Sequence, residues 1–162
     1  LSNMGNTCYL NASLQMLYTL KGFIPAIDGK GGGELVKSVV STAQRVLDIS
    51  KKPGLLNARP VKLAMDKISD KFRGFQQRDA HEFRGDLIDN IHEELVEGQK
   101  KLNADDMKSP TENERDETDQ GVPELPIDEY FRCDIEVCLK CNTCGYTRYD
   151  IKKECETSLL IP

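Results

Sequence analysis

The clearest absences in this 162-residue sequence are long apolar runs and clusters of basic residues. No apolar run approaches the roughly 18 residues that a membrane-spanning helix requires. The first residues lack the charged and apolar regions of a signal peptide, so we expect no secretory leader. Lysine and arginine form no stripe and the net charge is -5, which argues against nucleic-acid binding. We therefore expect neither a membrane nor a nucleic acid as a partner.

The six cysteines are unevenly placed, which argues against a secreted disulfide framework. Cys8 stands alone, whereas the other five lie between residues 133 and 155. One isolated thiol and one cluster are typical of a reactive cysteine and a metal site in a reducing compartment. The sequence therefore predicts a cytoplasmic or nuclear protein. It gives no indication of the oligomeric state.

Helical periodicity dominates the first hundred residues. Apolar residues recur every three or four positions in four segments, each with polar residues between them. The expected helices begin at Cys8, cover 34–49, cover 61–68 after Pro60, and cover 78–96.

The fourth expected helix has the clearest start. Asp79 is followed three residues later by Glu82, which is the pattern of a capping box, so we expect Asp79 to be the N-cap. Glu94 and His92 belong to the polar side of this helix, and we expect both to face water.

Three further segments are not helical in pattern. Residues 28–34 are glycine-rich but lack the Lys-Ser/Thr of a phosphate loop, so we interpret them as a flexible connection. Residues 104–120 hold seven acidic and two basic residues and almost nothing apolar. Their net charge equals that of the whole chain, so the rest of the chain is close to neutral. This composition predicts a disordered insert. Residues 130–141 and 146–162 read as two strands around a cysteine-containing turn.

These patterns predict an α+β fold in three parts. Residues 1–103 form a helical part, residues 104–126 an acidic disordered insert or loop, and residues 127–162 begin with a β-hairpin. A length of 162 residues and 38% apolar residues suffice for one core.

Cys8 has the surroundings of a nucleophile. It lies at the expected start of a helix, where unpaired N–H groups and the helix dipole favour a thiolate. Its backbone N–H and the side-chain amide of Asn3, across a glycine-containing turn, could both donate to an oxyanion. The alternative for a lone cysteine is a buried structural thiol.

Three motifs resemble those of the ubiquitin-specific proteases, which are papain-like enzymes that remove ubiquitin from proteins. Residues 1–20, "LSNMGNTCYLNASLQMLYTL", are similar to the family's cysteine box. Residues 75–83, "FQQRDAHEF", are similar to its Gln-Gln-Asp box, with Arg78 in place of the usual second glutamine. "CNTCGY", followed by "SLLIP", is similar to the start of its zinc ribbon. In order, the three motifs cover nearly the whole chain.

The resemblance implies a thiol-dependent deubiquitinase whose partners are ubiquitin and ubiquitinated proteins. It implies that Cys8 attacks the carbonyl of the C-terminal glycine of ubiquitin in an isopeptide bond and that Asn3 helps to hold the oxyanion. It further implies that Gln77 and Asp79 line the channel for the ubiquitin tail, whose arginines would suit an acidic Asp79. The alternative for Asp79 is a helix cap alone.

The cysteine turn is expected to hold half of a zinc site. Cys141 and Cys144 are two residues apart and Gly145 follows, which is a zinc-knuckle spacing with a glycine to accept a positive φ. The second pair of ligands would lie downstream. Zinc is therefore expected as a structural ion in the intact protein, and less so in this chain alone.

One departure from the family pattern concerns the catalytic base. Family members carry their catalytic histidine and its Asp or Asn partner far downstream, and we expect neither His81 nor His92 to replace it. The chain then resembles the thumb and the first fingers hairpin of the fold, with the palm largely missing. The alternative is a relative that binds ubiquitin or acts as a scaffold without hydrolysing it.

Overall fold

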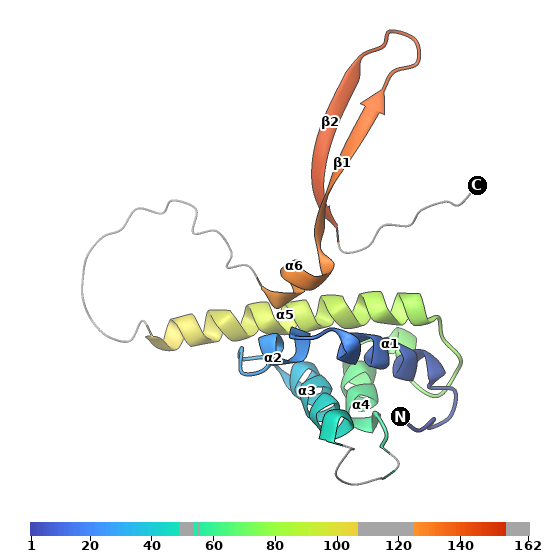
Figure 1. Ribbon diagram of the computed structural model, residues 1–162, viewed down its shortest axis with the longest axis vertical. Helices are drawn as coiled ribbons and strands as arrows, with labels where there is room; N and C mark the ends of the chain where they lie inside the picture. Colours follow the sequence, from blue (N-terminus) through green and yellow to red (C-terminus); the bar gives the residue numbers. More distant parts are fainter. Residues whose placement is uncertain (49–53, 55, 107–124, 155–162) are drawn as a thin grey trace.

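The computed structural model describes residues 1–48, 54, 56–106 and 125–154 (Figure 1). Its elements in chain order are α1 (Cys8–Thr19), α2 (Phe23–Ile27), α3 (Glu34–Leu47), α4 (Arg59–Ile68), the 3-10 helix η2 (Asp70–Phe72), α5 (Ala80–Asp106), α6 (Pro126–Phe131), β1 (Cys133–Lys140) and β2 (Thr147–Glu154). We call the helices together the helical body and the two strands the hairpin.

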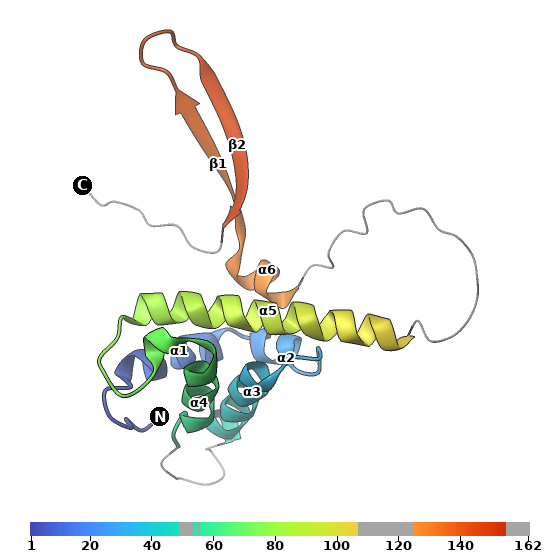
Figure 2. The ribbon, with the colours of Figure 1, turned by 180° about the vertical axis from the view of Figure 1, so that it is seen from behind.

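Helix α5 is the axis of the helical body. Helices α1 to α4 lie along one side of it, and the short α6 lies on the opposite side, as the views from front and back both show (Figures 1 and 2). Helices α1 and α3 contact α5 directly, and α3 also contacts α4. The body is thus organised around one long helix that joins its two layers.

The expected amphipathic stripes form the core. Leu10, Leu14 and Leu17 of α1 recur at helical spacing and are fully buried, as are Leu87 and Ile91 of α5. Burial of each such side chain stabilises the fold by about 1.5–3 kcal/mol relative to exposure. No helix in the described ranges has both the length and the apolar character to cross a membrane. The four predicted helices are therefore confirmed, with a few changes at their ends.

Helix α6 corrects the expectation of a strand starting at Tyr130. The chain is helical through Phe131, and β1 begins only at Cys133. The Asp128 carboxylate accepts a hydrogen bond of 3.0 Å from the Leu125 N–H and so closes the first turn. The Tyr130 ring meets the buried Phe23 ring edge to face at 5.5 Å. Tertiary contact with α2 thus overrides the local pattern.

Helix α5 also continues further than expected. It was expected to end near residue 96 but runs to Asp106, three residues into the segment predicted as a disordered insert. Residues 107–124 lie outside the described residues, whereas Leu125 and Pro126, the last two residues of the expected insert, are the N-cap and the first residue of α6. Helices α2 and η2 were not predicted, because five and three residues are too short to display a periodic pattern.

Glu94 does not face water as expected but caps another helix. Its two carboxylate oxygens accept hydrogen bonds from the N–H groups of Leu35 (3.0 Å) and Val36 (2.9 Å) at the start of α3. A carboxylate at a helix N-terminus satisfies unpaired donors and complements the helix dipole. This contact holds the end of the glycine-rich connection against α5.

The hairpin differs from the body in that it has no core. Strands β1 and β2 pair in antiparallel register from Cys133 opposite Glu154 to Lys140 opposite Thr147, so the predicted hairpin is confirmed. It extends away from the helices, joined to them through α6 (Figures 1 and 2). None of its described side chains is buried, and Leu139 and Tyr149 are more than half exposed.

Candidate active site

The turn that precedes Cys8 is held together by the side chain of Asn3. The Asn3 Oδ1 accepts hydrogen bonds from the N–H of Gly5 (3.0 Å), the N–H of Thr7 (3.1 Å) and the hydroxyl of Thr7 (3.1 Å). Gly5 and Asn6 both have positive φ, at 104° and 49°, which glycine and asparagine tolerate best. The amino-acid types of this turn therefore match the backbone that it adopts.

Cys8 is the first residue of α1, and its thiol is exposed. The preceding residue, Thr7, is buried and does not cap the helix with its side chain, since its hydroxyl donates to Asn3 and accepts from the N–H of Met4 (3.0 Å). No described side chain therefore caps the first N–H groups of α1, and the positive end of the helix dipole lies beside Cys8. The alternative of a buried structural cysteine is wrong.

The side-chain amide of Asn3 uses its oxygen as an acceptor, and its NH2 group is available as a donor. Its carbonyl oxygen is committed to the turn, whereas its NH2 group makes no hydrogen bond to any residue that the structure describes. An amide oriented in this way presents donors rather than an acceptor to its surroundings. The geometry is compatible with the oxyanion role, which stays a prediction.

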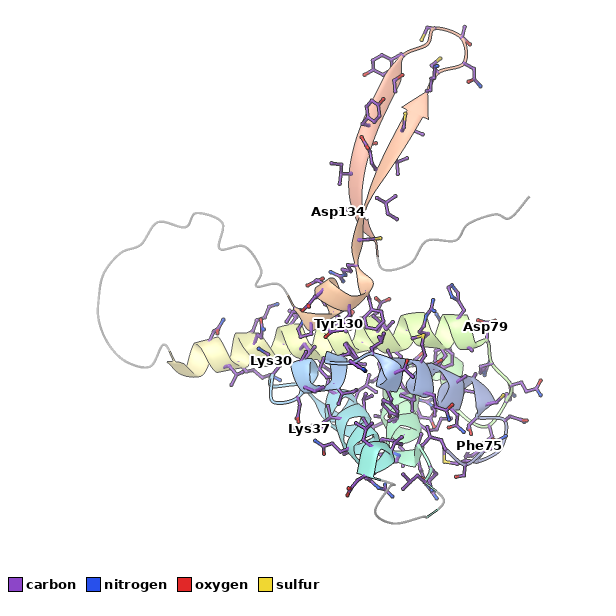
Figure 3. All side chains as sticks on the ribbon, viewed as in Figure 1. Lys30, Lys37, Phe75, Asp79, Tyr130 and Asp134 are labelled. Carbon is purple, nitrogen blue, oxygen red and sulfur yellow. The ribbon has the colours of Figure 1, made fainter. Side chains whose placement is uncertain are left out.

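The loop that carries Gln77 and Asp79 lies against the Cys8 turn. The Asn6 side-chain amide donates to the Phe75 carbonyl (3.0 Å), and the Ser13 hydroxyl of α1 lies 3.3 Å from the Ala80 carbonyl. Phe75 and Asp79 lie at the end of the body where α5 begins (Figure 3). These contacts join residues 69 and 67 positions apart in sequence, so the two segments predicted as functional are neighbours.

Asp79 is confirmed as the cap of α5. Its Oδ1 accepts a hydrogen bond of 2.9 Å from the Glu82 N–H. The backbone N–H groups of Glu82 and then His81 hold the pKa of the Asp79 carboxyl below its ordinary value. The carboxylate is nevertheless exposed, as is Gln77, so both can meet a ligand.

The two histidines have partners of their own. The His81 Nδ1 lies 3.0 Å from the Arg84 Nη2, on the exposed first turn of α5. The His92 Nε2 lies 3.9 Å from the Asp128 carboxylate of α6, so His92 is half-buried between helices and does not face water as expected.

The cysteine turn of the hairpin has the form of a zinc knuckle. The Cys141 N–H donates to the Tyr146 carbonyl (2.8 Å), and the Gly145 N–H donates back to the Cys141 carbonyl (3.0 Å). Gly145 has φ 72°, as its place in the motif predicts. The N–H groups of Cys144 and Thr143 lower the pKa of the Cys141 thiol.

These residues fit one half of a tetrahedral zinc site. Cys141 and Cys144 are both exposed at the tip of the hairpin, and donors directed at a sulfur favour the thiolate that zinc requires. Within the described residues no group of three or more potential ligands occurs. Cys155 and the "SLLIP" match lie outside the described residues.

One charged residue near these loops was not identified from the sequence. The Lys62 side chain on α4 is buried, and its ammonium pairs with Asp66 four residues later. The spacing of the pair is visible in the sequence, but surface pairs share it, so only the structure reveals the burial.

The comparisons with known proteins identify the family. The family model described as ubiquitin carboxyl-terminal hydrolase matches residues 1–156, and the chain belongs to that family. The resemblance to the ubiquitin-specific proteases is thereby confirmed.

Several curated relatives share this region. Ubiquitin carboxyl-terminal hydrolase 37 of Sus scrofa is 30% identical over 163 residues, which cover 89% of this chain and 15% of that protein. The Gallus gallus protein of the same name is 28% identical, with 90% and 16% covered, and Homo sapiens ubiquitin carboxyl-terminal hydrolase 29 is 28% identical, with 89% and 17% covered. The chain thus spans about a sixth of the length of these relatives.

Two solved structures share the fold. The SAGA DUB module of Ubp8, Sgf11, Sus1 and Sgf73 bound to monoubiquitin matches with a TM-score of 0.65 at 18% identity, over 96% of this chain and 34% of that chain. The same module bound to ubiquitin aldehyde matches with a TM-score of 0.63 at 20% identity, over 96% and 33%. The predicted α+β fold, a helical thumb followed by a fingers hairpin, is confirmed.

Proposed function

We propose that this chain is the nucleophile-bearing part of a cysteine-type deubiquitinase that hydrolyses isopeptide bonds at the C-terminus of ubiquitin. The observation that carries the proposal is the exposed Cys8 thiol at the uncapped start of α1, beside a turn anchored by Asn3. Membership of the ubiquitin carboxyl-terminal hydrolase family supports it.

The proposed reaction proceeds through an acyl-enzyme. The Cys8 thiolate adds to the carbonyl carbon of the terminal glycine, and the oxyanion that forms accepts hydrogen bonds from the Cys8 N–H and the Asn3 amide. Collapse of this intermediate breaks the C–N bond, and the departing lysine amine takes up a proton. Water then hydrolyses the thioester, which releases ubiquitin and restores the thiol.

The proton-transferring imidazole is proposed to lie outside residues 1–162. The His81 ring contacts Arg84 on its own helix, and the His92 ring contacts Asp128 of α6. The chain alone is therefore proposed to be inactive, since a general base contributes about a hundred- to ten-thousand-fold in rate.

Gln77 and Asp79 are proposed to bind the C-terminal tail of ubiquitin. Both are exposed, and the loop that carries them lies against the Cys8 turn. The negative charge of Asp79 suits the arginines of that tail. The Ubp8 modules that share this fold are bound to monoubiquitin and to ubiquitin aldehyde, which supports ubiquitin and ubiquitinated proteins as partners.

The remaining proposals concern organisation and cofactor. Residues 1–103 would be the thumb, 104–126 an insert, and 127–162 the start of zinc-ribbon fingers. Cys141 and Cys144 would hold a structural zinc ion together with two ligands from elsewhere in the protein. A cytoplasmic or nuclear location is proposed from the cysteine pattern, since one isolated thiol and one cluster are typical of a reducing compartment.

The alternative is a relative that binds ubiquitin without hydrolysing it. The contacts of both histidines favour this alternative if the natural protein supplies no other base. Exposed Gln77 and Asp79 would serve binding in either case.

Hydrolysis of a ubiquitin-fluorophore conjugate by the full natural protein separates the two functions. We expect turnover that Cys8→Ala reduces by at least about a thousandfold, because the nucleophile is lost. Cys138→Ala, which removes an exposed thiol of the hairpin, is the matched control and should retain full activity. Absence of turnover together with ubiquitin binding would favour the non-catalytic alternative.

A further inference from the structure

Lys62 is a buried cation beside the proposed site. Its side chain is 3% exposed, and its ammonium donates to the Phe72 carbonyl (2.9 Å) and pairs with the Asp66 carboxylate. The ammonium also lies 5.5 Å from the centre of the Phe75 ring. Burying an ammonium costs free energy that such contacts must offset. An apolar side chain could fill this space without that cost. The buried lysine therefore matters for the groups that its ammonium contacts.

What Lys62 holds is the loop between η2 and α5. The loop turns at Gly74, which has φ 84°. In the part of the chain that the structure describes, no backbone-to-backbone hydrogen bond joins residues 74–78 to another segment. The loop is instead fixed near its start by the Lys62 ammonium and by the Asn6 amide on the Phe75 carbonyl.

Phe75 connects the two sides of the proposed site. Its carbonyl bonds to the Cys8 turn through Asn6, and its ring faces the Lys62 ammonium. The ring is otherwise loosely held, since Phe75 is 60% exposed and a cavity of about 200 Å³ adjoins it, lined in part by Met4 and Leu63. Without the cation there is room for the ring, and with it the loop, to shift.

We propose that Lys62 is a positioning residue for ubiquitin-tail binding. It fixes the Phe72 carbonyl and the Phe75 ring, and thereby sets the position of Gln77 relative to Cys8. This inference rests on the proposed function, because it gives Gln77 and Asp79 the tail-binding role. Lys62 itself touches neither the substrate nor the reacting atoms.

The test is Lys62→Met in the full natural protein, with steady-state kinetics on a ubiquitin-fluorophore substrate. We expect KM to rise about ten- to a hundredfold and kcat to stay within about threefold, because displaced tail contacts weaken binding of substrate and transition state alike. Lys67→Met is the matched control, since Lys67 is an exposed lysine of the same helix, 2.6 Å from the exposed Glu34. Its KM should equal that of the wild type.

Hydrogen exchange distinguishes positioning from a general structural role. In Lys62→Met the amides of Phe72, Arg73 and Glu82, which donate hydrogen bonds at the two ends of the loop, should exchange faster, whereas those of α1 and α3 should be unchanged. An unaltered KM, or exchange that rises equally throughout the body, would overturn the inference. If Lys62→Met does not fold, Phe75→Ala replaces it, because an exposed ring can be truncated without loss of the core. An unchanged KM in Phe75→Ala would likewise overturn it.

A control keeps this inference separate from the proposed function. The wild-type protein and Lys62→Met are both treated with a saturating concentration of ubiquitin that carries a C-terminal electrophile. Labelling of both shows that Cys8 can react in each protein. A raised KM in Lys62→Met then reflects weaker binding of ubiquitin. If the wild type is not labelled, the proposed function fails, and the inference about Lys62 fails with it.

Discussion

The helical body and the hairpin are stabilised in opposite ways. Every buried apolar side chain among the described residues belongs to the body or its connections, whereas those of the hairpin are half-buried or exposed. The body therefore has a core of its own. The hairpin has backbone pairing and a turn, and an isolated two-stranded hairpin is marginal in water.

The two candidate sites are organised in different ways before a ligand binds. The Cys8 turn rests on packed helices, and its hydrogen bonds to Asn3 and Phe75 fix it before any ligand binds. Among the described residues, the Cys141 turn is organised by N–H groups of its own residues. We therefore expect the Cys8 site to lose activity when the packing of the body is weakened. We expect the Cys141 turn to be ordered mainly by a bound metal ion.

The largest expected effect comes from paired truncations in the two regions. Leu14→Ala should lower the free energy of unfolding of the body by about 2–5 kcal/mol, because it leaves a cavity at a fully buried position. Leu139→Ala on β1, where the side chain is 56% exposed, should cost less than about 0.5 kcal/mol. Native-state hydrogen exchange of the natural protein measures both. Equal losses would contradict the comparison.

A second variant separates the two functions of Asn3. Asn3→Asp keeps the oxygen that accepts from Gly5 and Thr7 but removes the NH2 donors. We expect kcat to fall about ten- to a thousandfold with KM little changed, because one oxyanion donor is lost. Asn57→Asp is the control, since its Oδ1 also accepts a local N–H (3.2 Å) and its side chain is no part of the proposed oxyanion site. Full activity of Asn3→Asp would leave Asn3 as a turn residue only.

A third prediction concerns zinc, which should affect the stability of the hairpin and not that of the helical body. The natural protein should bind about one zinc ion, and Cys144→Ser should abolish this binding while Cys138→Ser does not. Loss of zinc should speed amide exchange in β1 and β2 but not in α1 or α5, since only the hairpin lacks a core. Metal analysis and hydrogen exchange measure the two effects. Equal zinc contents in the two variants would refute the knuckle assignment.

The smallest expected effect is a pH dependence within the body. Hydrogen bonds hold the pKa of Asp79 below its ordinary value, so its carboxylate stabilises the fold. This stabilisation is fully present above about pH 3.9, the ordinary value, and is lost as the pH falls through the folded value. The difference in Tm between wild type and Asp79→Ala should therefore be constant from pH 7 to about pH 4 and shrink below it. Asp89→Ala, at an exposed position of the same helix, should show no such trend.

What the sequence predicted well follows from periodicity and local chemistry. The stripes of α1, α3 and α5, the cap at Asp79 and the turn at Gly145 are all properties of residues close together in the chain. The motifs around Cys8 and Gln77 indicated the family because each is a short stretch of neighbouring residues.

What the sequence did not reveal depends on contacts between distant segments. Glu94 caps α3 from 58 residues away or more, and Tyr130 is helical because it packs on Phe23. Lys62 reads as a surface residue until η2 folds over it. In each case a tertiary partner decides whether a charged or aromatic side chain is exposed, and no local pattern contains that partner.

The most direct test of the central claim is to locate the nucleophile chemically. The full natural protein is treated with ubiquitin carrying a thiol-reactive group at its C-terminus, and the adduct is mapped by peptide mass spectrometry. We predict a single adduct on Cys8 and its loss in Cys8→Ser. An adduct on the exposed hairpin thiols Cys133, Cys138, Cys141 or Cys144, or labelling that persists in Cys8→Ser, would contradict the account.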